Sequence, residues 1–73
     1  MAMFEITIYN KEVREKVEAG EHDSRFRDSW ADFQYIEIEA DNEEQVRAKV
    51  EVMHPGVQGF VIDDIRKISG GFE

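Results

Sequence analysis

The sequence contains no cysteine, and only one of its 73 residues is proline. Without thiols the chain can form neither a disulfide nor a thiolate metal site, which fits a reducing compartment. No apolar run approaches the roughly 18 residues that a membrane-spanning helix needs, so we expect no membrane association. The N-terminus has no basic stretch ahead of a long apolar one, unlike a secretory signal, and a cytoplasmic location is expected.

Basic residues are also scarce, with 9 lysines and arginines against 17 aspartates and glutamates and a formal net charge of −8. A surface of this kind repels phosphate backbones, so direct nucleic-acid binding is not expected and a basic or neutral protein is the favoured partner. The apolar share of 41% is enough for a folded chain. A length of 73 residues allows one domain with a small core.

Three segments show the alternation of apolar and polar residues that is typical of half-buried strands, at about 3–9, 33–40 and 59–66. In the third segment Ile65 is out of phase with Ile62, and two aspartates lie between them. A bulge at the aspartates would return Ile65 to the side of Ile62. The alternative is a strand that ends at Ile62.

Two segments have helical spacing, a short one at about 11–19 and a long one at about 42–54. Asn10 is a candidate N-cap for the first, and Gly20 suits the position after its end. Asp41, followed three residues later by a glutamate, resembles a capping box for the second. The expected apolar stripe of the long helix consists of Val46, Val50 and Met53, widened by Ala48 and Val52.

These elements predict an α+β two-layer sandwich, in which both helices cover one face of a three-stranded mixed or antiparallel sheet. The compact domain would span residues 1–68, and residues 69–73, with two glycines, would form a flexible tail.

Residues capable of catalysis are few, and none lies in a nucleophile, phosphate-binding or metal-ligand motif. We therefore expect no catalytic residue, metal or cofactor. An enzymatic interpretation would have to use His22 or His54, the only two histidines, together with a carboxylate.

The segment at 21–32 has no regular period, yet it contains Arg25, Phe26, Arg27 and Trp30. Tryptophan and arginine are enriched where proteins bind one another, so these residues are a candidate contact site. In the alternative interpretation, the two rings close the small core and the arginines pair with nearby carboxylates. Those carboxylates are Asp23, Asp28 and Asp32.

A second candidate contact is the polar face of the predicted sheet, where Tyr9, Phe33 and Tyr35 would lie. Glutamates share this face and would repel phosphates, so a protein interface and ordinary cross-strand pairing between aromatics are the two interpretations.

The sequence thus predicts a small acidic, non-catalytic protein-interaction module that binds another protein or a second copy of itself. The alternative function is an acidic inhibitor of a nucleic-acid-binding protein, of the type that mobile elements and phages encode. It rests on a run of carboxylates, which a solvated strand end and helix start would also explain. The run consists of Glu37, Glu39, Asp41, Glu43 and Glu44.

Overall fold

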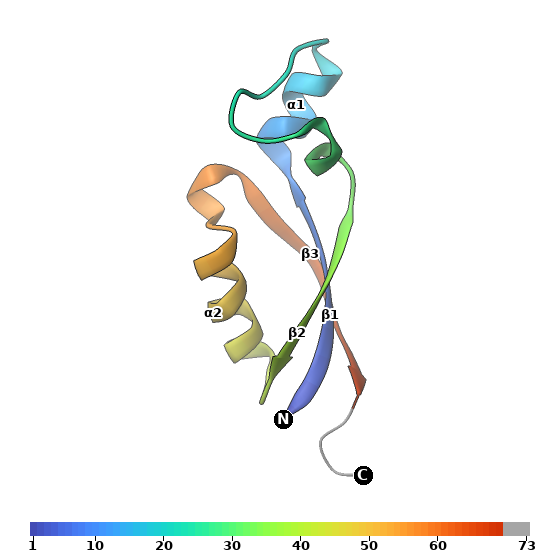
Figure 1. Cartoon of the computed structure of the whole chain (residues 1–73), viewed down its shortest axis with the longest axis vertical. Coiled ribbons are helices and arrows are strands. Elements are labelled where there is room, and N and C mark those ends of the chain that lie inside the picture. Colours follow the sequence, from blue (N-terminus) through green and yellow to red (C-terminus); the bar gives the residue numbers. More distant parts are fainter. Residues whose placement is uncertain (70–73) are drawn as a thin grey trace.

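A computed structural model describes residues 1–69 of the chain and confirms the predicted α+β fold, with a three-stranded sheet and two helices (Figure 1). The elements in chain order are β1 (Ala2–Asn10), α1 (Lys11–Glu18), the 3-10 turn η1 (Asp28–Ala31), β2 (Gln34–Ala40), α2 (Glu43–Met53), the 3-10 turn η2 (Gly56–Gln58) and β3 (Phe60–Ser69). The third strand therefore extends three residues beyond its predicted end. The rest of the predicted tail, residues 70–73, lies outside the described residues.

The sheet is antiparallel, with β1 in the centre and the order β2-β1-β3. Since β2 and β3 both run opposite to β1, they are parallel to each other, and α2 connects them across the strand between them. This is a split β-α-β unit. Both β2 and β3 pair on one side only, so the sheet has two edges.

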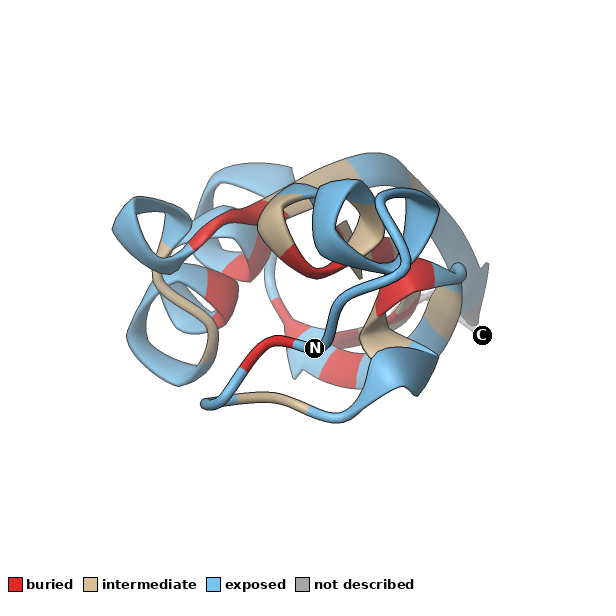
Figure 2. Ribbon diagram, turned by 90° about the horizontal axis from the view of Figure 1, so that it is seen from above, coloured by how far each residue is buried: buried red, intermediate tan, exposed pale blue. Residues whose placement is uncertain are grey.

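The inner face of the sheet follows from the alternation in β1, where buried and partly exposed residues alternate along the whole strand. Strand geometry sends alternate side chains to opposite faces, so every second residue of β1 faces the helix layer. Figure 2 looks along the long axis and shows the buried residues gathered inside, with the outer helical turns exposed. The core consists of Ala2, Phe4, Ile6, Ile8, Ile38, Ala40, Val46, Val50 and Phe60.

The predicted bulge in β3 is present, and the alternative end at Ile62 is wrong. The register of β3 against β1 shifts after Ile62, and the next pair is Thr7 with Asp64. The extra residue returns Ile65 to the inner face, opposite Ile6, where it packs against the core. The out-of-phase isoleucine in the sequence was thus the signal of the bulge.

The helix ends match the sequence at α1 and differ by one residue at α2. The side chain of Asn10 accepts hydrogen bonds from two backbone N–H groups of the first turn of α1, at 3.0 and 3.1 Å, and Gly20 has a positive φ of 78° after its end. At α2 the N-cap is Asn42, whose side chain accepts from the backbone N–H of Gln45 at 2.9 Å. The Gln45 side chain in turn accepts from the backbone N–H of Asp41, so the expected capping role of Asp41 is wrong.

The two helices occupy different places along the molecule. The long helix, α2, lies over one face of the sheet, whereas α1 continues from β1 beyond the end of the sheet, beside η1 (Figure 1). Within residues 1–69, neither helix has the length and apolar character that crossing a membrane would require.

Candidate functional site

The irregular segment before β2 contributes its two large rings to the core. The Trp30 ring lies 5.1 Å from the Phe60 ring and 5.1 Å from the His54 ring, and the Phe26 ring lies 5.0 Å from Phe60. The Phe60 side chain is buried, and Phe26 and Trp30 are partly buried against the core. Edge-to-face packing of this kind stabilises a core beyond its buried area. The structure therefore agrees with the interpretation in which these rings close the protein's own core.

Arg25 is held by an ion-pair network within this loop region. Its Nη2 lies 2.6 Å from a carboxylate oxygen of Glu12 and 3.2 Å from one of Asp23, and its backbone N–H donates to Asp23 at 2.7 Å. The Asp23 side chain is only 2% exposed. Hydrogen bonds from the side chain and backbone of Arg25 hold the pKa of Asp23 below its usual value, and bonds to Asp23 and Glu12 raise the pKa of Arg25. Arg25 thus fastens the loop to the first turn of α1.

The other ion pairs expected in this loop are absent. Arg27 is exposed and has no ion-pair partner within residues 1–69, and the same holds for Asp32. Asp28 pairs instead with His22, whose Nδ1 lies 2.8 Å from a carboxylate oxygen. Of the two arginines among the candidate contact residues in the loop, Arg27 is thus the one without an ion-pair partner in residues 1–69.

The two histidines lie in different settings and do not form a joint site. The His22–Asp28 pair has the arrangement of a general base, but the His22 side chain is 79% exposed, where nothing excludes water from a reacting group. His54 lies against the rings of Trp30 and Phe60, where burial lowers its pKa. No group of three or more metal-ligating side chains occurs among residues 1–69.

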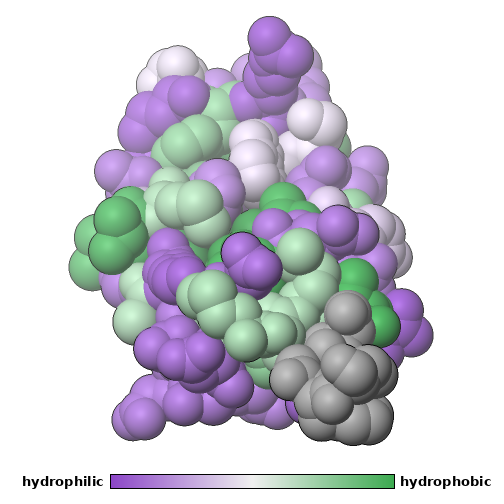
Figure 3. All heavy atoms as spheres, turned by 60° about the horizontal axis from the view of Figure 1, so that its bottom comes forward, coloured by the Kyte–Doolittle hydropathy of each residue, from purple (hydrophilic) through white to green (hydrophobic). Residues whose placement is uncertain are grey.

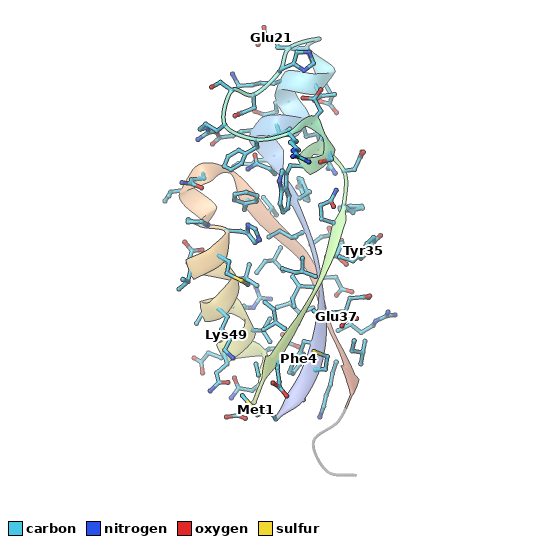
Figure 4. All side chains as sticks on the ribbon, viewed as in Figure 1. Met1, Phe4, Glu21, Tyr35, Glu37 and Lys49 are labelled. Carbon is cyan, nitrogen blue, oxygen red and sulfur yellow. The ribbon has the colours of Figure 1, made fainter. Side chains whose placement is uncertain are left out.

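The predicted aromatics of the outer sheet face include a packed group and one free ring. Tyr9 and Phe33 meet edge to face at 5.7 Å, and the guanidinium of Arg14 lies 3.9 Å from the centre of the Tyr9 ring. Arg14 Nε also donates to the carbonyl of Ala31 at 2.8 Å, which ties α1 to η1. Arg14 could not be predicted from the sequence, because its approach to the rings depends on how α1 turns after β1. Tyr35, at 65% exposed, remains free on this face (Figure 4).

The glutamates on the outer face are unequally neutralised. Glu5 and Glu37 are direct cross-strand partners, and like charges in that position are destabilising. Arg66 on β3 compensates Glu5 through a contact of 2.8 Å. Glu37 and Glu39 have no ion-pair partner in the described part of the chain. Figure 4 shows Tyr35 and Glu37 projecting from the face of the sheet that points away from α2.

An open apolar groove lies between α2 and the edge of β2, and we call it the α2–β2 groove. It has a volume of about 390 Å³. Its lining residues are Glu37, Ile38, Lys49, Val52 and Met53. Figure 3 brings this end of the molecule forward and shows hydrophobic residues breaking the hydrophilic surface on the side that carries α2.

The helical periodicity predicted Val52 and Met53 in the core stripe of the long helix, and this prediction is wrong. Val52 is 82% exposed and Met53 is 52% exposed, while Val46 and Val50 are buried. A sheet of three strands is too narrow to cover both sides of the stripe, so the side toward β2 stays open. The helical periodicity identified the apolar residues of α2, but it could not show how much of the helix the sheet covers.

Comparison of the chain with protein-family models, with curated proteins and with solved structures found no match.

Proposed function

We propose that this chain is a non-catalytic protein-interaction module that binds its partner at the α2–β2 groove. The observation that carries the proposal is the exposure of Val52 and Met53 beside Ile38, at an edge of the sheet. Exposed apolar residues that line one depression are typical of binding surfaces, and a free sheet edge offers backbone hydrogen bonds beside them.

The loop and the aromatic sheet face are weaker candidates for the contact. Phe26 and Trp30 pack against the protein's own Phe60, so their apolar surface is already partly used. On the sheet face, Tyr9 and Phe33 are packed together beside Arg14. Residues that stabilise the free protein have less surface to offer a partner.

The surface charge supports a basic partner. The net charge is −8, and Glu37, which borders the α2–β2 groove at the edge of β2 and has its side chain on the outer face, has no ion-pair partner in residues 1–69. The alternative function as an acidic inhibitor has less geometric support, because its carboxylates divide between the outer sheet face and the first turn of α2, in the other layer. A phosphate-like surface would need them on one face.

A matched pair of surface variants tests the proposal. Val52 lines the groove, whereas Val57 on η2 is equally apolar and 88% exposed but lies outside it. Partners captured from the source cells by the immobilised protein would be identified, purified and titrated against Val52→Gln, Val57→Gln and the wild type. We expect Val52→Gln to weaken binding by roughly tenfold and Val57→Gln to change it less than about twofold. Equal affinity of all three proteins would contradict the groove as the contact.

A further inference from the structure

The two edges of the sheet differ in their readiness to accept another strand. The pairing of β3 with β1 has two register shifts, and such bulges twist an edge strand away from a regular ladder. The pairing of β2 with β1 runs from Ala40 to Gln34 with no shift. A regular edge strand leaves alternate backbone N–H and C=O groups without a neighbouring strand. β2 is therefore the edge that suits strand addition.

The helix layer covers this edge only slightly. Lys49 on α2 donates from its Nζ to the backbone carbonyl of Glu39 at 2.6 Å, and no other α2 side chain in the described structure bonds to the β2 backbone. Lysine at an edge is a common protection against unspecific pairing, and a flexible side chain is easily displaced. Among residues 1–69, no backbone hydrogen bond outside the sheet involves β2, and the α2–β2 groove lies beside Glu37 and Ile38 of this strand.

The two faces of the sheet beside β2 favour different side chains on an added strand. Alternate residues of that strand would point toward the helix layer and enter the groove between Ile38 and the exposed Val52 and Met53, which favours apolar residues. The residues between them would lie on the outer face, beside Glu37 and Glu39.

Charge on the outer face favours lysine or arginine at those positions. Across the sheet, Arg66 pairs with Glu5, and Glu5 lies directly opposite Glu37, which lacks a cation. A basic residue on the far side of β2 would continue this row as cation, carboxylate, carboxylate, cation. It would also offset the repulsion between the two neighbouring glutamates.

We propose that β2 accepts an extended segment of a basic partner as a fourth strand, with apolar residues alternating with lysine or arginine. The inference rests on the proposed function and adds the binding mode and the chemistry of the partner. A second copy of the chain is a poorer occupant. Antiparallel pairing of two β2 strands centred beside the groove would set Glu37 against Glu37 or Glu39 of the other copy, and each copy has a net charge of −8.

The test uses a synthetic seven-residue peptide of alternating lysine and valine, titrated into the isotopically labelled protein and followed by NMR. One control peptide has the same composition with the lysines and valines in two blocks. A second has the alternating sequence with every other backbone nitrogen methylated, which removes donors from one edge of the peptide strand. We expect the alternating peptide to shift the amide signals of β2 and of Val52 and Met53, and to bind at least fivefold more tightly than both controls.

Two protein variants complete the test. Glu37→Gln should weaken binding of the alternating peptide at least threefold, whereas Glu43→Gln, an equal charge change on α2, should leave it within twofold. Equal binding of all three peptides, signal changes confined to β3 or the loop, or a wild-type dimer that pairs through β2 would overturn the inference. A partner whose affinity depends on Val52 but not on Glu37 or on backbone donors would overturn strand addition alone. A partner insensitive to Val52 would overturn the proposed function itself.

Discussion

At the scale of single residues, Trp30 shows how a residue type common in interfaces can serve the core of a small domain. Its ring packs against the rings of both His54 and Phe60, which also contact each other, and completes the end of the core near η1. A domain of this size has few apolar residues, so a tryptophan in an irregular segment adds substantially to its core by covering one end of it.

Replacing Trp30 should therefore destabilise the free protein. We expect Trp30→Ala to lower the free energy of unfolding by about 2–3 kcal/mol, below the range for a fully buried tryptophan because the ring is only partly buried. Urea unfolding followed by circular dichroism measures the difference. Tyr35→Ala is the control, since this ring is 65% exposed, and it should cost less than about 0.5 kcal/mol. Similar losses for the two variants would show that Trp30 is not part of the core.

His54 should make stability depend on pH in a defined direction. Burial lowers its pKa below the ordinary value of 6.5, so the unfolded chain binds a proton at a higher pH than the folded protein does. The stabilisation of the folded state by uncharged His54 is fully present above the unfolded pKa of 6.5. It is lost as the pH falls through 6.5 toward the lower pKa of the folded state.

Urea unfolding at a series of pH values between about 7.5 and 5.5 measures this loss. The decline in the free energy of unfolding should be shallower in His54→Gln. Val57→Gln is the control, because it changes an exposed side chain that carries no proton, and it should keep the wild-type slope. A decline that is unchanged in His54→Gln would assign the pH dependence to other groups.

At the scale of elements, local patterns in the sequence predicted the strands and their faces well. The phase of Ile65 indicated a bulge in β3 but left open a strand that ends at Ile62, and the register of β3 against β1 shows the bulge. The patterns could not show which apolar residues of α2 are buried against the sheet. Burial of Val52 would require a further strand or helix beside β2, and the chain supplies none within residues 1–69.

The candidate site was predictable only in part, for the same reason. The sequence assigned Tyr9 and Phe33 to one face of the sheet, yet the contact of their rings with Arg14 depends on the angle between β1 and α1. The α2–β2 groove depends on the sheet order, and a sequence with three strands permits several orders. Residues that are distant in sequence meet through topology, which local periodicity does not encode.

The capping of α2 gives a prediction at this scale. Asn42→Ala should lower the free energy of unfolding by about 1 kcal/mol, because it leaves the Gln45 backbone N–H without its acceptor. Asp41→Ala should cost less, since the Asp41 backbone N–H still donates to the Gln45 side chain. Thermal unfolding of both variants against the wild type measures the difference. A larger loss for Asp41→Ala would restore the capping role that the sequence suggested for it.

At the scale of the whole molecule, the sheet is open on both sides and one helix layer covers it incompletely (Figure 1). Such a molecule needs a feature that prevents its regular edge strand, β2, from pairing with β2 of another copy. The uncompensated carboxylates of Glu37 and Glu39 on β2 provide one, because antiparallel pairing would bring like charges together. The same charges that favour a basic partner would thus also keep the chain from self-association.

This double role predicts how the molecule responds when the charges are removed. The double variant Glu37→Gln, Glu39→Gln should self-associate, with a weight-average mass in sedimentation equilibrium that rises with concentration, while the wild type should stay at its monomer mass of 8.5 kDa. The double variant Glu43→Gln, Glu44→Gln changes the net charge by the same amount but acts on the first turn of α2, and it should remain monomeric. If both double variants associate alike, the net charge of the molecule, and not the edge of β2, is what keeps the copies apart. If neither associates, the backbone of β2 is protected by other means, and Lys49 on the Glu39 carbonyl is the contact to remove next.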